Sequence, residues 1–168
     1  MITELQLKQK LTEMLRKHEG NKLYVYLDTE KKPTIGIGRC LSTKGLSKKE
    51  CDYLKLGTYD KNKVIEILKV RKITQPEADY LLSNDIEYFT NEIEKSLPYF
   101  KTLPDSVKLV LLDMSFNLGI NGLLNFKNTI ALIKNGNYKH ASKEMLNSKW
   151  AKQVGYRAID LSKMLYQS

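Results

Sequence analysis

The sequence has few of the residues that build metal centres, disulfide frameworks and nucleotide sites. It contains only two cysteines and two histidines in 168 residues. Cys40 and Cys51 form no Cys-x-x-Cys motif, and His18 and His140 stand alone. We expect two unpaired thiols and no structural zinc. The Gly36-x-Gly38 pair lacks the third glycine of a dinucleotide fingerprint, so we expect no cofactor.

Long apolar runs are also missing. No uninterrupted apolar stretch approaches the ~20 residues that a membrane-spanning helix needs. The first eleven residues carry Glu4 and Gln6 and lack the apolar centre of a secretory signal. We therefore expect a protein without stable membrane insertion, located in the cytoplasm of the bacterial cell that makes it.

Charge is present in excess of one sign. The chain has 28 Lys and Arg against 19 Asp and Glu, a formal net charge of +9. Such a charge favours association with polyanions through long-range fields, and it does not determine the fold. Nucleic acid, an acidic membrane surface and anionic cell-wall polymer all fit. The length suits one domain of 1–168, and 42% hydrophobic residues can form its core.

Two β-type segments flank a short polar turn. Residues 23–28 alternate in character and favour a strand, 29–33 are typical of a turn, and 34–41 favour the returning strand. A hairpin of this kind brings Asp28 and Thr34 to opposite sides of one turn. Two glycines on one face of a strand often indicate close approach by a ligand or another backbone. The alternation predicts one face with Tyr24, Tyr26 and Asp28 and another with Leu23, Val25 and Leu27.

The remaining segments favour helices. Residues 3–18 form an amphipathic pattern with a capping box of Thr3 and Gln6, and Gly20 is placed to end it. Thr74 and Glu77 form a second capping box at the start of the longest pattern, and 107–118 is apolar on nearly every side. Further helices are expected near 47–56, 60–70, 128–134, 137–146 and 156–165.

The predicted fold class is α+β and mostly α. We expect a small N-terminal lobe with a β-hairpin at about 13–73, a connecting helix at 74–97 and an all-helical lobe at 98–168. Helix 3–18 is expected to pack on the helical lobe. No internal repeat is visible.

Two carboxylates lie at the ends of adjacent elements. Glu19 follows a helix and Asp28 ends a strand, so both side chains can reach one cleft. Glycosidic cleavage typically uses one protonated carboxylic acid and a second carboxylate across the sugar. Thr34 adds a hydroxyl that can help Asp28 hold a water. By itself, a Glu and an Asp nine positions apart is more typical of a solvated surface than of a catalytic site.

Several motifs in order resemble the phage-type lysozymes, the endolysin family of T-even bacteriophages. Glu-x8-Asp-x5-Thr lies within HEGNKLYVYLDTEKKPTIGIG, and ITQPEADYLLSNDI resembles the start of that family's connecting helix. DMSFNLG, NFKNTIALIKNG and SKWAKQVGYRA resemble its later helices. The resemblance covers the chain apart from about 42–72, and it implies a lysozyme-like fold.

The resemblance also implies an activity. The family's members are muramidases that cut the β-1,4 bond between N-acetylmuramic acid and N-acetylglucosamine in peptidoglycan. Carried over, Glu19 is the general acid, and Asp28 with Thr34 activates the attacking water, which inverts the anomeric centre. A monomer that lyses the bacterial wall after release from the cell is expected, either as a phage endolysin or as an exported bacterial effector.

Four further positions match the family's substrate side. By resemblance, Phe116, Asn117 and Thr129 line the sugar-binding cleft, and Arg157 approaches Glu19. A guanidinium favours the ionised form of a nearby carboxyl, whereas a general acid must carry a proton. We therefore expect Arg157 mainly to orient Glu19, while bound saccharide expels water and restores the protonated form. Trp150 is expected to pack in the interior.

The sequence departs from the family at two positions. Arg39 stands where relatives often carry His, so a buried His–Asp pair is absent or replaced there. Arg39 is expected either to pair with an acid on the connecting region or to face the anionic wall. Glu144 stands where some relatives carry an amide for substrate, so that contact is not carried over.

Three other functions fit parts of the sequence. A lytic transglycosylase needs the acid without a water-activating carboxylate, which Asp28 and Thr34 argue against. A basic nucleic-acid-binding module has the charge but no recognition motif in this sequence, so no nucleic-acid partner is expected. A catalytically inactive wall-binding protein is disfavoured by the intact Glu19, Asp28 and Thr34.

Overall fold

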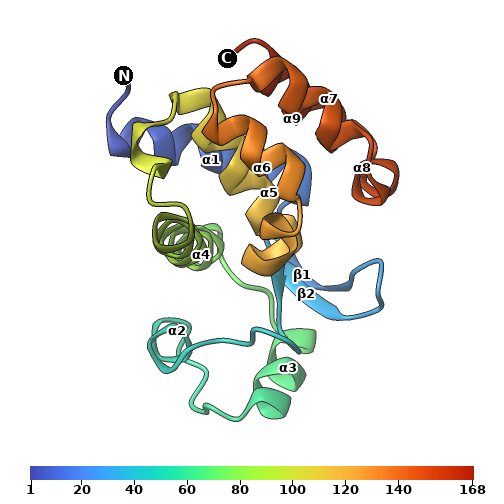
Figure 1. Cartoon of the computed structure of the whole chain (residues 1–168). Coiled ribbons are helices and arrows are strands. Elements are labelled where there is room, and N and C mark those ends of the chain that lie inside the picture. Colours follow the sequence, from blue (N-terminus) through green and yellow to red (C-terminus); the bar gives the residue numbers. More distant parts are fainter. The chain divides into compact units, whose positions relative to one another are not determined.

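Helices form most of the chain, and three short strands form one antiparallel sheet in the order β1-β2-β3 (Figure 1). The computed structural model describes residues 1–168. This architecture confirms the α+β, mostly α, prediction. The elements are α1 (Glu4–Glu19), β1 (Lys22–Leu27), β2 (Pro33–Gly36), β3 (Arg39–Cys40), α2 (Lys48–Tyr53), α3 (Lys61–Val70), α4 (Gln75–Ser96), the 3-10 turn η1 (Phe100–Thr102), α5 (Asp105–Leu124), α6 (Lys127–Lys134), α7 (Tyr138–Leu146), α8 (Lys149–Val154) and α9 (Tyr156–Tyr166).

The chain forms two compact units. The hairpin unit consists of Thr12–Asp85, and the helical unit consists of Met1–Leu11 with Ile86–Ser168. Helices α1 and α4 therefore each contribute residues to both. Their action as the lobes of one domain, with the boundaries given above, stays a prediction.

Both predicted capping boxes are present at the helix starts. The Thr3 N–H donates to Gln6 Oε1 at 2.9 Å, and the Gln6 N–H donates to Thr3 Oγ1 at 3.1 Å. At the start of α4, the Thr74 N–H donates to Glu77 Oε1 at 2.8 Å, and the Glu77 N–H donates to Thr74 Oγ1 at 3.2 Å. Each box satisfies backbone donors that the first turn leaves without a helical partner, which fixes where the helix begins.

The hairpin departs from the predicted alternation in β1. Tyr26 pairs with Thr34 and Leu27 with Pro33, but the register is irregular between Lys22 and Tyr26. Leu23 and Val25 pack on the core as predicted, whereas Leu27 is 62% exposed. The predicted placement of Leu27 is therefore wrong. Between the Lys22–Gly36 and Tyr26–Thr34 pairs, β1 has two residues more than β2, and the strict alternation of faces is lost there.

The returning strand is shorter than predicted. Instead of one strand over 34–41, β2 ends at Gly36 and β3 resumes at Arg39. Gly36 and Gly38 have φ of 66° and 75°, a left-handed conformation that interrupts a regular strand. A side chain at Gly36 would lie 3.7 Å from Ala78 of α4, so the strand packs tightly against that helix.

Helix α5 is the buried centre of the helical unit, as predicted. Its residues from Val107 to Ser115 are almost all buried. Gly119, with φ of 73°, breaks the helical backbone, but the helix resumes and ends at Leu124, beyond the predicted end. By length and composition α5 would also suit a membrane span, and its packing inside the unit gives its apolar residues another explanation. Helix α8 was not predicted.

Arg39 is the most heavily bonded side chain of the hairpin unit and is only 2% exposed. Its guanidinium makes two bonds to Glu50 of α2, at 2.8 and 2.9 Å, and two to Asp85 of α4, at 2.8 and 3.1 Å. It also donates to the carbonyls of Gly45 and Leu81. Lys44 adds a second cation to Asp85. Of the two expectations for Arg39, pairing with an acid on the connecting region is confirmed, and exposure toward the anionic wall is wrong because the side chain is buried.

The Glu50 carboxyl makes the stability of this network dependent on pH. Burial alone would raise its pKa, but the hydrogen bonds and the charge of Arg39 lower the pKa from an ordinary 4.5 to about 2. A group whose pKa is lower in the folded than in the unfolded protein stabilises the fold at pH values above its unfolded pKa. This stabilisation is lost as the pH falls toward the folded pKa.

We predict that Glu50→Gln lowers the free energy of unfolding at pH 7, and that its deficit relative to the wild type narrows between pH 4.5 and pH 2. Urea unfolding across that range measures the gap. Glu66→Gln, at an exposed position of α3, is the matched control and should show a small gap that does not vary with pH. A Glu50→Gln deficit that stays constant down to pH 2 would contradict the prediction.

Candidate functional site

Three of the predicted site residues lie in the hairpin unit. Glu19 is the last residue of α1, Asp28 follows β1, and Thr34 lies in β2. The hairpin brings Asp28 and Thr34 to the two sides of its turn, as the sequence predicts. Their catalytic roles stay a prediction at this point.

The carboxylate of Asp28 is fixed by its own turn. Its Oδ1 accepts hydrogen bonds from the backbone N–H groups of Glu30 and Lys32, both at 2.8 Å. The Asp28 N–H also donates to the Lys32 carbonyl at 3.0 Å, and Lys31 takes a left-handed φ of 59°. Oδ2 takes no part in these bonds. The bonds of Oδ1 thus fix the orientation of the whole carboxylate.

Thr34 lies beside this turn and is only 3% exposed. Its hydroxyl donates to the Lys32 carbonyl at 3.1 Å. Since that bond uses the hydroxyl proton, the oxygen can accept a hydrogen bond but has no proton left to donate. Beside a carboxylate, such an oxygen can receive one proton of a water whose other proton points at Asp28.

Glu19 packs against a glycine of the same unit. A Cβ built on Gly38 would lie 3.1 Å from Glu19 Oε2 and 3.2 Å from its Cδ. Gly38 therefore leaves room for the carboxylate. The group that approaches this glycine is a side chain, whereas the glycine pair predicted a ligand or another backbone. The role of Gly38 toward Glu19 itself was missed, because only the folded chain brings the two together.

Side chains also tie the end of α1 to the start of α4. Arg16 donates to Asp79 at 2.6 Å, Gln75 donates to the same oxygen at 3.0 Å, and Asn21 donates to Gln75 at 2.8 Å. These bonds flank Glu19 on both sides in the sequence. They fix the direction in which the chain leaves the helix and enters β1.

Arg157 lies in the helical unit and is bonded to a buried carboxylate. It is 7% exposed, and its Nε donates to Asp113 Oδ1 at 2.8 Å while Nη2 donates to the Asp113 carbonyl at 3.1 Å. Asp113 is fully buried and was missed, although an acid that interrupts the apolar stretch from Leu109 to Met114 was a visible signal. The predicted approach of Arg157 to Glu19 stays a prediction.

The other predicted sugar contacts belong to the helical unit as well. Asn117 is exposed, and its Oδ1 accepts from Trp150 Nε1 at 2.7 Å. Trp150 is 6% exposed and meets Phe126 edge-on, which agrees with its expected packing role. Thr129 is buried, and with Trp150 it lines a hollow of about 340 Å³. The half-buried Phe116 packs on Phe89, with the two ring centroids 5.1 Å apart.

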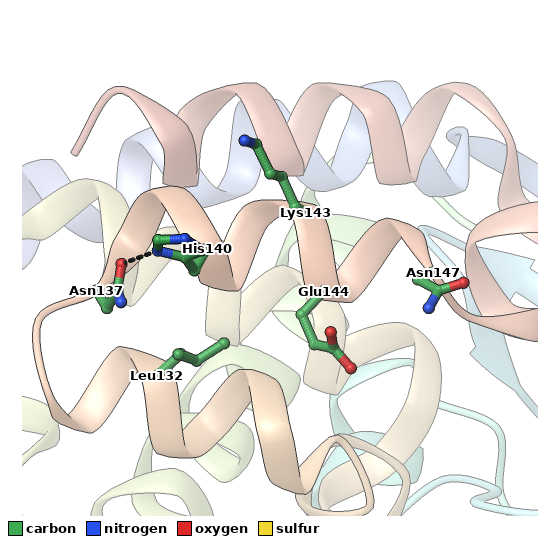
Figure 2. A pocket seen from close by; sticks show the side chains of 6 residues that line it. All are labelled: Leu132, Asn137, His140, Lys143, Glu144 and Asn147. Carbon is green, nitrogen blue, oxygen red and sulfur yellow. Dashed lines mark hydrogen bonds between the residues drawn. The ribbon is translucent and has the colours of Figure 1, made fainter.

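A second hollow, of about 470 Å³, lies between α6 and α7 (Figure 2). His140 Nδ1 and Asn137 Oδ1 are 2.7 Å apart at one end, and the side chains of Lys143 and Glu144 point in opposite directions. Glu144 and Asn147 line both hollows. The amide and charged groups here suit hydrogen bonding to a polar ligand.

The order of these elements and the motifs on them match one known family. Residues 16–163 match the model of the family described as phage lysozyme. The chain belongs to the phage lysozyme family. The small sheet, the long α4 and the helices that follow agree with its lysozyme-like fold.

Relatives support this membership over most of the chain. Two proteins of Dictyostelium discoideum, probable T4-type lysozyme 1 and probable T4-type lysozyme 2, are each 32% identical and cover 88% of both chains. The pre-baseplate central spike protein Gp5 of Enterobacteria phage T4 is 30% identical over 158 residues, which make up 26% of that protein. Membership makes this chain a lysozyme, a glycoside hydrolase that acts on peptidoglycan.

The contact between Gly38 and Glu19 gives a prediction for this lysozyme. Gly38→Ala and Gly57→Ala each place alanine at positive φ (75° and 71°), so each should destabilise the fold by about 1 kcal/mol. Only the Gly38 substitution displaces Glu19, since nothing lies within 4 Å of a Cβ at Gly57. Misplacement of a reacting group by about 1 Å can cost about 100-fold in rate.

We therefore expect Gly38→Ala to lower the rate of peptidoglycan clearance about tenfold or more, and Gly57→Ala to leave it within about twofold. Thermal unfolding of both variants checks that the folds are equally weakened. Equal clearance rates for the two variants would show that the packing of Glu19 on Gly38 has no part in activity.

Proposed function

We propose that this lysozyme is a muramidase that cleaves the β-1,4 bond between N-acetylmuramic acid and N-acetylglucosamine in the bacterial cell wall, with inversion. Glu19 is the general acid that protonates the leaving oxygen. Asp28 is the general base, and it holds the attacking water together with Thr34. The geometry of the hairpin turn supports the roles of Asp28 and Thr34, and the family motif supports the role of Glu19.

The observation that carries the proposal is the way the turn holds Asp28, which binds one oxygen of the carboxylate and leaves the other out of these bonds. A base needs an oriented and ionised oxygen, and the bonds of Oδ1 to the turn supply that orientation. Thr34, whose proton is used by the Lys32 carbonyl, is an acceptor only. A water that donates to Asp28 and to Thr34 directs a lone pair outward, as an attacking nucleophile must.

The substrate side of the proposal uses the helical unit. Phe116, Asn117 and Thr129 contact the sugars, and Arg157 orients Glu19 until bound saccharide expels water. The bonds from Arg157 to the buried Asp113 support this, since they keep the guanidinium in one rotamer. The excess positive charge of the chain favours binding to the anionic wall.

Clearance of purified peptidoglycan tests the two carboxylates. We expect Glu19→Gln and Asp28→Asn each to lower the rate of peptidoglycan clearance about 100-fold or more, which is the usual contribution of a general acid or base. Both amides keep the size of the side chain, and the asparagine keeps an oxygen that can accept the turn bonds. The rate of turbidity loss is the measurement, and circular dichroism checks the fold.

Glu30→Gln is the matched control. Glu30 lies in the same turn, binds Asp28 only through its backbone N–H and pairs with the exposed Lys32. Its variant should clear peptidoglycan at the wild-type rate. Full activity in Glu19→Gln would remove the proposal.

A further inference from the structure

Tyr26 lies close to the three proposed catalytic residues of the hairpin unit. It is the cross-strand partner of Thr34 and stands two positions before Asp28. Directly paired residues of an antiparallel hairpin have their Cβ atoms about 5 Å apart on the same face. The half-buried Tyr26 side chain is therefore a neighbour of the Thr34 hydroxyl.

The irregularity of β1 accounts for this position. Tyr24, two residues earlier, is 51% exposed, and strict alternation would place Tyr26 on the same face. The register shift between Lys22 and Tyr26 instead turns Tyr26 inward and Leu27 outward. Bulges of this kind frequently re-aim a side chain next to an active site.

Charged groups surround the Tyr26 ring. The Lys22 ammonium lies over the ring, 4.3 Å from its centroid, which is an attractive cation–π geometry. Burial and then the negative charges of Glu19 and Asp28 raise the pKa of the Tyr26 phenol. The hydroxyl therefore stays protonated around neutral pH and can donate a hydrogen bond.

We propose that Tyr26 is a positioning residue of the Glu19–Asp28–Thr34 centre, whose hydroxyl donates to the water that Asp28 and Thr34 hold. This inference rests on the proposed function. The Thr34 oxygen accepts one proton of the water and Asp28 accepts the other. The water oxygen keeps two lone pairs, one of which accepts from Tyr26 while the other faces the sugar.

The reaction is balanced with this arrangement. The water oxygen bonds to the anomeric carbon as the glycosidic C–O bond breaks. The water gives one proton to Asp28, and Glu19 gives its proton to the leaving sugar oxygen. Tyr26 keeps its proton throughout, so its part is to orient the water and not to transfer a proton.

Tyr26→Phe removes this donor and keeps the ring. Loss of one hydrogen bond beside charged groups corresponds to a fall in kcat of about 10-fold or more. We expect that fall on soluble glycan fragments, with KM within about twofold of the wild type because no sugar contact is removed. Tyr24→Phe is the matched control on the same strand and should keep both constants. An unchanged kcat in Tyr26→Phe, or a loss confined to KM, would overturn the proposal.

Titration of the phenol tests the same arrangement without any assay of activity. The carbon-13 signal of the Tyr26 ring, assigned by its absence in Tyr26→Phe or by its connection to the neighbouring backbone, reports the pKa. We expect the pKa of the phenol to fall in Glu19→Gln and in Asp28→Asn, and to stay unchanged in Glu30→Gln.

The possible failures are distinguishable. If the pKa of Tyr26 is the same in all these variants, the hydroxyl does not face the two carboxylates, and the inference fails even if the protein is a two-carboxylate muramidase. If Glu19→Gln clears peptidoglycan at the wild-type rate, the proposed function fails whatever the titration gives. Should Tyr26→Phe fail to fold, the titration of the wild-type tyrosine still decides.

Discussion

The buried guanidinium of Arg39 is the constraint on which the hairpin unit depends. It joins β3 to Glu50 of α2 and to Asp85 of α4, and it is covered from solvent. Removing one partner of such a network leaves a charge buried without compensation, which typically costs about 3–5 kcal/mol. Glu50 also accepts the Ser47 N–H that begins α2. One carboxylate thus fixes a helix start and the end of the sheet together.

This anchoring matters for the proposed chemistry because the hairpin unit carries the three residues to which we assign it. Asp28 and Thr34 are bonded to the turn itself, and Glu19 packs on Gly38, next to Arg39 in the sequence. A catalytic water must be held within a fraction of an ångström, and that requires side chains whose neighbours cannot move. The left-handed backbone at Lys31 and Gly38 is the conformational cost of this compact arrangement.

Local features of this fold were predictable from the sequence. The Thr3–Gln6 and Thr74–Glu77 boxes and the apolar centre of α5 depend on residues within a turn or two of each other. The family motifs added Glu19, Asp28 and Thr34. Arg39 was predicted to meet an acid on the connecting helix, but Glu50 as its second partner was not. That bond joins two segments whose proximity arises only in the folded chain.

Two of the unpredicted features share this origin, and the third is a matter of length. The irregular step in β1 depends on how the hairpin packs, and no alternation of residue types indicates it. The carboxylate of Asp113 is explained only by Arg157, 44 positions later. Helix α8 is six residues long and begins at a Ser148 cap, too short for a periodic pattern to reveal it.

The central claim is that Asp28 directs a water, rather than the substrate's own hydroxyl, to the face opposite the leaving group. The most direct test is the anomeric configuration of the first product. Proton NMR can record it during the early turnovers, before mutarotation mixes the two anomers. Inversion of the β-1,4 bond predicts that the new reducing end appears as the α anomer. A β anomer, or an anhydro end without a free anomeric hydroxyl, would contradict the account.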